Sequence, residues 1–292
     1  MIEVINQASG ENWAAFHGDC VEVVSGLPDR SVDYSIFSPP FASLYTYSNS
    51  PRDMGNCRDD AEFFAHFDHL VRELARVIKP GHNVSFHCMQ LPTSKERDGY
   101  IGLKDFRGDL IRAFQRHGFI YASEVCIWKD PVTAMQRTKA LGLLHKTIRT
   151  NATMSRQGIA DYLVTMRTPG EVEDRVAHAD LPVDEWQRLA SPVWMDINPN
   201  DTLQFRSARE HDDERHISLL QLEVIRRGVR LWTKPGDVVL SPFMGIGSEG
   251  YVSLQMGRRF VGAELKTSYF EQAARNLQMA TSQGDLLGGA AA

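Results

Sequence analysis

Hydrophobic and polar positions follow two different periods along most of this chain. Short apolar runs rich in β-branched and aromatic residues predict strands over residues 32–37, 84–89, 120–128, 162–166, 238–240 and 259–264. Apolar residues at helical spacing predict helices over residues 61–77, 105–115 and 219–231, and another that ends near residue 256. Because strands and helices alternate, the pattern predicts an α/β fold with a doubly wound sheet.

Other stretches show neither period. Residues 42–60 and 192–215 are rich in turn-forming and polar residues, which predicts loops. Residues 129–156 carry six basic side chains against one acid, whereas residues 170–185 are acidic. The tail 284–292 consists mostly of small residues and is predicted to be frayed.

Composition narrows the class of protein without naming a function. The 292 residues are 42 % hydrophobic and 24 % charged, as in an ordinary globular protein. No run of about 18 apolar residues and no secretory signal is present, and the four cysteines form no C-x-x-C pair. We therefore expect a cytoplasmic protein. A net charge of −5 argues against coating by nucleic acid, although a local basic surface is compatible with it.

A glycine cluster follows the apolar run 238–240. Gly245, Gly247 and Gly250 form the pattern G-x-G-x-x-G between a strand and a helix, and Glu264 ends the next strand 19 residues after Gly245. Glycines allow a ligand to approach the backbone, and an acid at that distance typically accepts hydrogen bonds from ribose hydroxyls. The alternative is a tight turn without a ligand. A dinucleotide needs two mononucleotide-binding halves, so a ligand that needs one half, such as S-adenosylmethionine, fits better.

A second motif follows the predicted strand 32–37. Ser38-Pro39-Pro40-Phe41 cannot continue a central strand, because neither proline donates a ladder hydrogen bond. The chain therefore leaves the sheet at a carboxyl strand end, where open α/β sheets bind ligands. In isolation the motif is also compatible with a plain turn, with Phe41 in the core and the upstream Asp19 as a helix cap.

Together the two motifs resemble the β class of S-adenosylmethionine-dependent DNA amino-methyltransferases, including orphan prophage-type members. That class combines Ser/Asp/Asn-Pro-Pro-aromatic first with Phe-x-Gly-x-Gly last, and the resemblance spans about residues 13–279. It implies a mostly parallel, Rossmann-like methyltransferase sheet with an inserted target-recognition region. The implied division is a catalytic half (1–128), a target-recognition insertion with a returning core strand near 161–167 (129–215) and a cofactor-binding half (216–292).

The resemblance also implies roles for individual residues. Ser38 and the Pro39 carbonyl would accept the hydrogens of an exocyclic amine, so that its lone pair faces the methyl donor. Phe41 would stack on a base flipped out of the duplex. The implied catalytic residues are Ser38, Pro39, Pro40 and Phe41, and the implied S-adenosylmethionine-binding residues are Asp19, Cys20, Ser38, Phe243, Gly245, Gly247 and Glu264. Ser241 stands where many members have Asp.

The basic stretch is the candidate contact with double-stranded DNA, through phosphate neutralisation. Its basic residues are Lys129, Arg137, Lys139, Lys146, Arg149 and Arg156. The alternative is a solvated charged face. A homodimer is compatible with the family, and no membrane is expected as a partner. No metal is expected either, because methyl transfer needs none and the spacing of His211 and His216 is not that of a zinc site.

The identity of the methylated base stays open at this point. Ser at the first motif position favours cytosine N4, whereas the whole-chain resemblance favours adenine N6. Cytosine C5 chemistry is disfavoured because no Pro-Cys step occurs. An RNA amino-methyltransferase and an inactive DNA-binding homologue are the rival functions. No nuclease domain is recognisable in the chain, so we expect methylation without cleavage even if the protein serves a restriction-modification system.

Overall fold

The computed structural model describes residues 4–41, 54–132, 145–151, 158–174, 176–177, 179–204 and 220–288. Within these residues the strands are β1 (Asn6–Gly10), β2 (Trp13–His17), β3 (Val32–Phe37), β4 (Ile78–Met89), β5 (Leu91–Pro92), β6 (Leu103–Lys104), β7 (Ile120–Ile127), β8 (Asp161–Arg167), β9 (Val193–Trp194), β10 (Val238–Ser241) and β11 (Arg259–Glu264). The helices are α1 (Cys20–Ser25), α2 (Asp60–Val77), α3 (Lys95–Asp98), α4 (Phe106–Arg116), α6 (His145–Thr150), α7 (Val183–Leu189), α8 (Leu222–Trp232), α9 (Ser248–Gln255), α10 (Thr267–Gly288) and the 3₁₀ turn η2 (Met54–Asn56).

One large sheet organises the described residues. Its order is β1-β2-β11-β10-β3-β4-β8-β7-β9, and β5 pairs with β6 separately. The five strands β2, β11, β10, β3 and β4 are mutually parallel neighbours. β1 is antiparallel to β2, and β8 is antiparallel to both β4 and β7. The predicted α/β fold with a mostly parallel sheet is confirmed.

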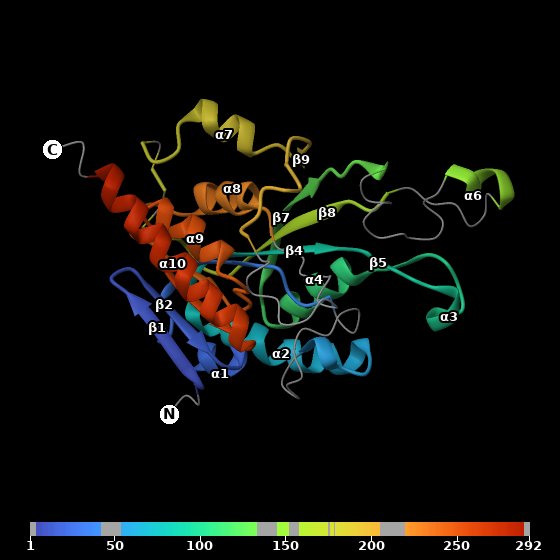
Figure 1. The fold of residues 1–292 in the computed structure, drawn as a ribbon, viewed down its shortest axis with the longest axis horizontal. Coiled ribbons are helices and arrows are strands. Elements are labelled where there is room, and N and C mark those ends of the chain that lie inside the picture. Colours follow the sequence, from blue (N-terminus) through green and yellow to red (C-terminus); the bar gives the residue numbers. More distant parts are fainter. Residues whose placement is uncertain are drawn as a thin grey trace.

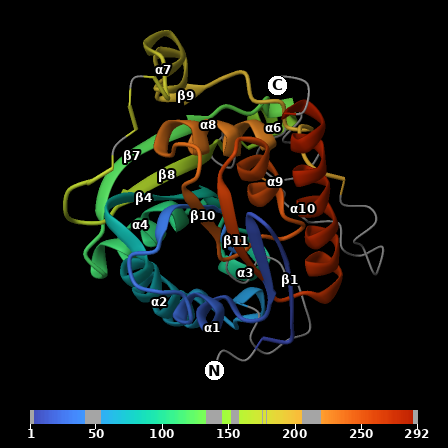
Figure 2. The ribbon, with the colours of Figure 1, turned by 90° about the vertical axis from the view of Figure 1, so that its left-hand side faces the viewer.

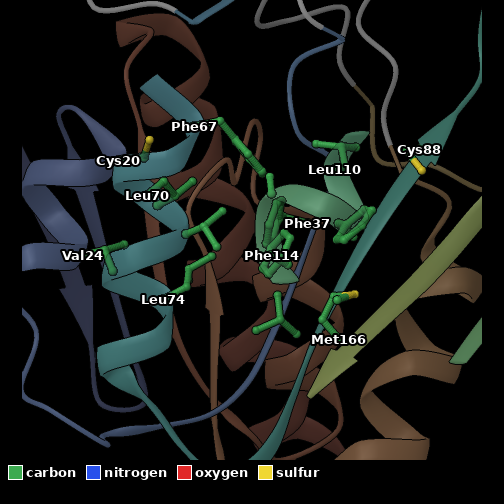
Figure 3. Packing of buried hydrophobic residues seen from close by; sticks show 14 of the residues in the cluster. Cys20, Val24, Phe37, Phe67, Leu70, Leu74, Cys88, Leu110, Phe114 and Met166 are labelled. Carbon is green, nitrogen blue, oxygen red and sulfur yellow. The ribbon is translucent and has the colours of Figure 1, made fainter. Parts of the chain in front are cut away.

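Helices cover both faces of this sheet, with α1, α2 and α4 on one side and α8, α9 and α10 on the other (Figures 1 and 2). Each face has its own hydrophobic core. Figure 3 shows the first, where Phe67, Leu70 and Leu74 of α2 pack toward Phe37 of β3 and Phe114 of α4. On the opposite face, the buried side chains of α8, α9 and α10 form a second cluster with alternate residues of β3. Two covered faces make the sheet doubly wound.

The residues Lys79-Pro80-Gly81 belong to a strand although they include a proline and a glycine. α2 ends at Val77 and β4 begins directly at Ile78, so these three residues lie inside the strand. The pairing of β4 with β3 jumps from Ile78 to Asn83, which leaves a bulge. Gly81 adopts a φ of 75° and donates to the Pro169 carbonyl at 3.2 Å. The bulge accommodates a proline that cannot donate a ladder bond.

Several elements lie outside the sequence-based expectation. The β1–β2 hairpin and the short strand β9 were not predicted, and α10 continues to Gly288, into the tail predicted to be frayed. α6 lies within the basic stretch that showed no period, and Figure 1 shows it at the end of the molecule away from α10. No helix among the described residues is both long and apolar enough to cross a membrane.

Candidate active site

Four neighbouring strands end at the same edge of the sheet, and the predicted site residues follow them. Asp19 comes after β2, Ser38 after β3, Gly245 after β10, and Glu264 ends β11. Since β2, β11, β10 and β3 are parallel and adjacent, their carboxyl ends meet at one edge. The fold therefore brings together the catalytic motif and the glycine motif, which lie about 200 residues apart in the sequence.

The glycine turn requires its glycines. Gly245 has a φ of 52° and Gly247 a φ of 85°, both in the left-handed region that side chains disfavour. Glu264 holds the turn in place, because its Oε2 accepts the Gly245 N–H at 2.9 Å and its Oε1 accepts the Lys266 N–H at 2.9 Å. Gly250 has a different role: a Cβ there would lie 2.4 Å from Leu277, so this glycine permits close helix packing.

The surface of this turn fits a nucleoside-bearing cofactor. A Cβ added at Gly245 would meet no heavy atom within 4 Å, so open space lies beside the backbone. The neighbouring Gly18 N–H donates to the Glu264 carbonyl at 3.0 Å, which places Asp19 close to Glu264. Carboxylates accept hydrogen bonds from hydroxyl and amino groups, the groups that a nucleoside presents. Binding of the cofactor by Gly245 and Gly247 stays a prediction that this geometry is compatible with.

Two predicted cofactor residues have structural roles that the structure shows directly. Asp19 caps α1, since its Oδ1 accepts the N–H groups of Val21 and Glu22 at 2.8 and 3.2 Å. The Cys20 side chain is buried in the hydrophobic core, and this burial, together with Asp19, raises the pKa of the thiol well above its usual value. Cys20 therefore stays a neutral packing residue. The cap proposed as an alternative for Asp19 is present.

Phe243 links the two motifs. Its ring packs against Phe37, the last residue of β3, with centroids 5.7 Å apart and planes tilted by 55°. Phe37 directly precedes Ser38, whereas Phe243 lies two residues before Gly245. This contact fixes the start of the catalytic motif relative to the glycine turn.

Phe41, predicted to stack on a base, is buried in the structure. The side chain is only 3 % exposed, and its ring packs in the core against Phe106 with centroids 6.3 Å apart. In this conformation the Phe41 ring is not accessible to a base. It holds the end of the Pro-Pro turn against the hydrophobic core. The alternative that placed Phe41 in the core describes its position. Residues 42–53, which follow, lie outside the described residues.

Ser38 has one buried polar partner, His87, which in turn contacts Asp161; the sequence predicted neither residue. Its Oγ lies 3.3 Å from Nδ1 of His87 on β4. The Nε2 atom of His87 lies 3.0 Å from Oδ2 of Asp161, the first residue of β8. Both residues sit at strand positions, where a lone His or Asp gives no local signal. Their connection appears only through the pairing of β4 with β8.

Lys129, the first residue of the basic stretch, has a partner that the sequence did not predict. Its Nζ lies 2.5 Å from Asp161 Oδ2, so the partly exposed ammonium forms an ion pair with a buried carboxylate. Lys146 and Arg149 lie on α6 and are exposed, as a DNA contact requires. Arg137, Lys139 and Arg156 lie outside the described residues.

A buried acid follows the glycine turn. Glu249, in the first turn of α9, is buried, and its Oε2 has no hydrogen-bond partner among the described residues. Burial, with a smaller contribution from the charge of Glu264, raises the pKa of Glu249 from 4.5 to about 8. Among the described residues, no cluster of three or more His, Cys, Asp or Glu side chains could hold a metal, and His211 and His216 lie outside them.

Comparisons with known proteins agree with this geometry. The Type II methyltransferase M.BglII of Bacillus subtilis is 25 % identical over 258 residues, which cover 88 % of this chain and 66 % of that protein. The DNA adenine methyltransferase YhdJ of Escherichia coli K12 is 22 % identical, over 91 % of this chain and 82 % of its own. The solved structure of the PvuII DNA methyltransferase, specific for cytosine N4, superposes with a TM-score of 0.68 at 17 % identity, over 98 % and 97 % of the two chains.

The model of the N6 and N4 methyltransferase family, described as DNA methylase, matches residues 32–275. This range contains both Ser38 and Gly245. The match confirms the resemblance stated from the sequence and supports S-adenosylmethionine as the cofactor. The chain belongs to the N6/N4 family of DNA methylases.

Proposed function

We propose that the protein transfers a methyl group from S-adenosylmethionine to the N6 amino group of adenine in double-stranded DNA. The observation that carries the proposal is the position of Ser38 beside the glycine turn, on the adjacent parallel strands β3 and β10. When bound, S-adenosylmethionine supplies an electrophilic methyl group on a sulfonium. The open surface at Gly245, with the carboxylates of Asp19 and Glu264 nearby, is suited to hold its nucleoside part.

The catalytic turn can prepare the amine for attack. An exocyclic amine is a weak nucleophile because its lone pair is conjugated with the ring. Ser38 Oγ and the Pro39 carbonyl would each accept one amino hydrogen, which turns the lone pair out of the ring plane and toward the methyl group. The displacement then needs positioning and electrostatic support rather than a covalent enzyme intermediate. The buried Phe41 would hold this turn rigid from the core side.

Adenine is our preferred base because the whole chain resembles adenine-specific prophage-type enzymes and one relative is an adenine methyltransferase. Cytosine N4 is the second candidate, favoured by Ser at the first motif position and by the fold shared with the PvuII enzyme. The base must leave the duplex stack to reach Ser38, so we also propose base flipping. The division into 1–128, 129–215 and 216–292, with target recognition in the middle part, belongs to the same proposal.

The test is methylation of unmethylated duplex DNA of diverse sequence with labelled S-adenosylmethionine, followed by mass spectrometry of the nucleosides. The control is Ser38→Ala, for which we expect a loss of about 100-fold or more. Phe41→Ala is a poor control, because removing a buried Phe destabilises a fold by about 3–5 kcal/mol. N6-methyladenine that depends on Ser38 supports the proposal, and N4-methylcytosine assigns the second candidate. Cofactor binding with no methylated DNA nucleoside would exclude a DNA substrate and direct the search to RNA.

A further inference from the structure

A row of buried polar side chains leads from Ser38 into the protein. His87 is 3 % exposed and Asp161 is 2 % exposed. Ser38 Oγ lies 3.3 Å from His87 Nδ1, and His87 Nε2 lies 3.0 Å from Asp161 Oδ2. The second approach is close but bent, since Nε2 does not meet the geometry of a linear hydrogen bond. Burying two such groups is costly unless they are paired, and here each has the other as its partner.

The strand register places these residues in line. Phe37 pairs with Phe86 across β3 and β4, so the next residues, Ser38 and His87, come side by side at the carboxyl ends of the two strands. Side chains alternate along a strand, and Phe37 and Phe86 belong to the core beneath α2. Ser38 and His87 therefore face the opposite side of the sheet.

Asp161 arrives on this side from β8. It is paired across the sheet with Met89 of β4 and with Ile127 of β7. Lys129, two residues beyond Ile127, reaches the same carboxylate at 2.5 Å. Burial alone would raise the pKa of Asp161, but its interactions with His87 and Lys129 outweigh burial and hold that pKa below its ordinary value. Asp161 is thus a carboxylate, which can accept hydrogen bonds but not donate them.

The carboxylate of Asp161 determines which atom donates and which accepts at each step from Asp161 to Ser38. A neutral imidazole carries one hydrogen, and the nitrogen that faces a carboxylate is the one that keeps it. Nε2 of His87 then holds the hydrogen and Nδ1 presents its lone pair to Ser38. The Ser38 hydroxyl must donate to Nδ1, which leaves the Oγ lone pairs directed elsewhere.

We propose that His87 and Asp161 are positioning residues that hold the Ser38 hydroxyl in one orientation, as a hydrogen-bond acceptor for the amino group of the target base. This inference rests on the proposed function of Ser38. A free serine hydroxyl can donate or accept a hydrogen bond. If its hydrogen faced the amino group of the base, it would repel the amino hydrogens. His87 and Asp161 leave Ser38 only the role of acceptor toward the base. An Asp or Asn side-chain oxygen at this position would be an acceptor without such partners.

Two variants break the row at different points. In His87→Gln the amide can still donate to Asp161 from near the Nε2 position, but the Nδ1 acceptor that faces Ser38 is lost. In Asp161→Asn the shape is kept, but the imidazole is free to place its hydrogen on Nδ1, which reverses the Ser38 hydroxyl. Loss of an enforced tautomer is known to be severe where a buried carboxylate orients a catalytic histidine.

The test is a double-mutant cycle on single-turnover methyl transfer with Ser38→Ala, His87→Gln, Asp161→Asn and the double variants containing Ser38→Ala. We expect each positioning variant to lower the rate by about 10- to 100-fold, less than loss of a direct contact. We also expect the dissociation constants for cofactor and DNA to stay within about twofold of wild type. In the Ser38→Ala background the same changes should have no further effect, because His87 and Asp161 act through Ser38.

Additive losses in the double variants would overturn the inference and assign His87 and Asp161 a purely structural role. Unchanged rates in His87→Gln and Asp161→Asn would overturn it equally. Thermal unfolding and cofactor binding of each variant show whether it is folded, and if Asp161→Asn fails to fold, the His87→Gln cycle decides alone. A wild-type protein that methylates no DNA would contradict the proposed function itself, which is a separate outcome from an active enzyme with an additive cycle.

Discussion

Gly245 and Gly247 are two residues apart, yet their surroundings give them different sensitivities to a side chain. A Cβ at Gly245 enters open space, whereas a Cβ at Gly247 lies 3.3 Å from Ala273 of α10. Both positions have positive φ, so each Ala substitution costs about 1–2 kcal/mol in backbone strain.

We therefore expect Gly245→Ala to weaken S-adenosylmethionine binding more than Gly247→Ala, because its methyl group occupies the open space. Gly247→Ala should lower the free energy of unfolding more, through the added contact with α10. Isothermal titration and denaturant unfolding measure the two effects. Cofactor affinity unchanged in Gly245→Ala would show that the cofactor does not lie against this turn.

Glu249 predicts a dependence of stability on pH. Its pKa in the folded protein is about 8, above the ordinary 4.5, so folding favours the protonated acid. The stabilisation is complete below about pH 4.5 and is lost as the pH rises toward 8, at up to about 1.4 kcal/mol per pH unit. Glu249→Gln mimics the protonated acid and should become increasingly more stable than wild type between pH 5.5 and 8.5. Parallel stability curves for the two proteins would show that Glu249 is ionised without penalty.

Single residues also show which parts of the candidate site a sequence can reveal and which it cannot. Ser38 and Gly245 were predictable because local chemistry, prolines and glycines at a strand end, reveals them. Phe41 was placed by resemblance and Lys129 by the basic stretch that contains it, whereas their contacts with Phe106 and Asp161 join residues that are distant in sequence. His87 left no local signal at all.

At the scale of elements, the predicted strands and helices were those with a strong apolar period. α2 is an example, because Phe67, Leu70 and Leu74 recur on one face and Asp59 caps its start. The strand β1, with the sequence Asn-Gln-Ala-Ser-Gly, has almost no apolar side chains and is held by backbone pairing to β2. Hydrophobic periodicity cannot detect a strand that is not stabilised by burial.

Arg258 connects two helix ends and should be important for stability. It is 3 % exposed, and its guanidinium donates to the Thr233 carbonyl at 2.7 Å and to the Met256 carbonyl at 2.6 Å, at the C-caps of α8 and α9. Arg258→Met leaves these carbonyls without a donor, and we expect a loss of about 2–4 kcal/mol in the free energy of unfolding. The neighbouring exposed Arg259→Met is the matched control, with an expected loss below about 1 kcal/mol. Equal losses in a urea titration would contradict this role.

At the scale of the whole molecule, the net charge of −5 makes the placement of positive charge decisive for DNA binding. Lys146 and Arg149 are exposed on α6, which projects from the end of the molecule (Figure 1). If they neutralise phosphates, each Ala substitution should weaken DNA binding and reduce the slope of log K against log salt by about 0.9.

Cofactor affinity should not change in these two variants. Arg259→Ala is the control for net charge, because Arg259 begins β11 at the edge opposite Glu264. DNA binding is measured by fluorescence anisotropy over a range of salt concentrations. If the Lys146, Arg149 and Arg259 variants had the same slope of log K against log salt, the assignment of a DNA contact to α6 would be contradicted.

The architecture was predictable as a class but not in its strand order. The alternation of elements indicated a doubly wound sheet, whereas the antiparallel insertion of β8 between β4 and β7 depends on pairings that no local pattern encodes. The same limit applies to the site: its two motifs were visible separately, and their contact through Phe37 and Phe243 needed the folded chain.

The position of β10 between β3 and β11 has a consequence for how the protein is made. Val238 at the start of β10 donates to the Asp33 carboxylate at 2.8 Å, across 205 residues of chain. Until the ribosome has released that strand, β3 has an open edge in the middle of the future sheet, and exposed edges invite pairing with other chains. Contacts of such long range also slow folding. The edge of β3 that carries Ser38 at its end is therefore completed only after residues 238–241 have been synthesised.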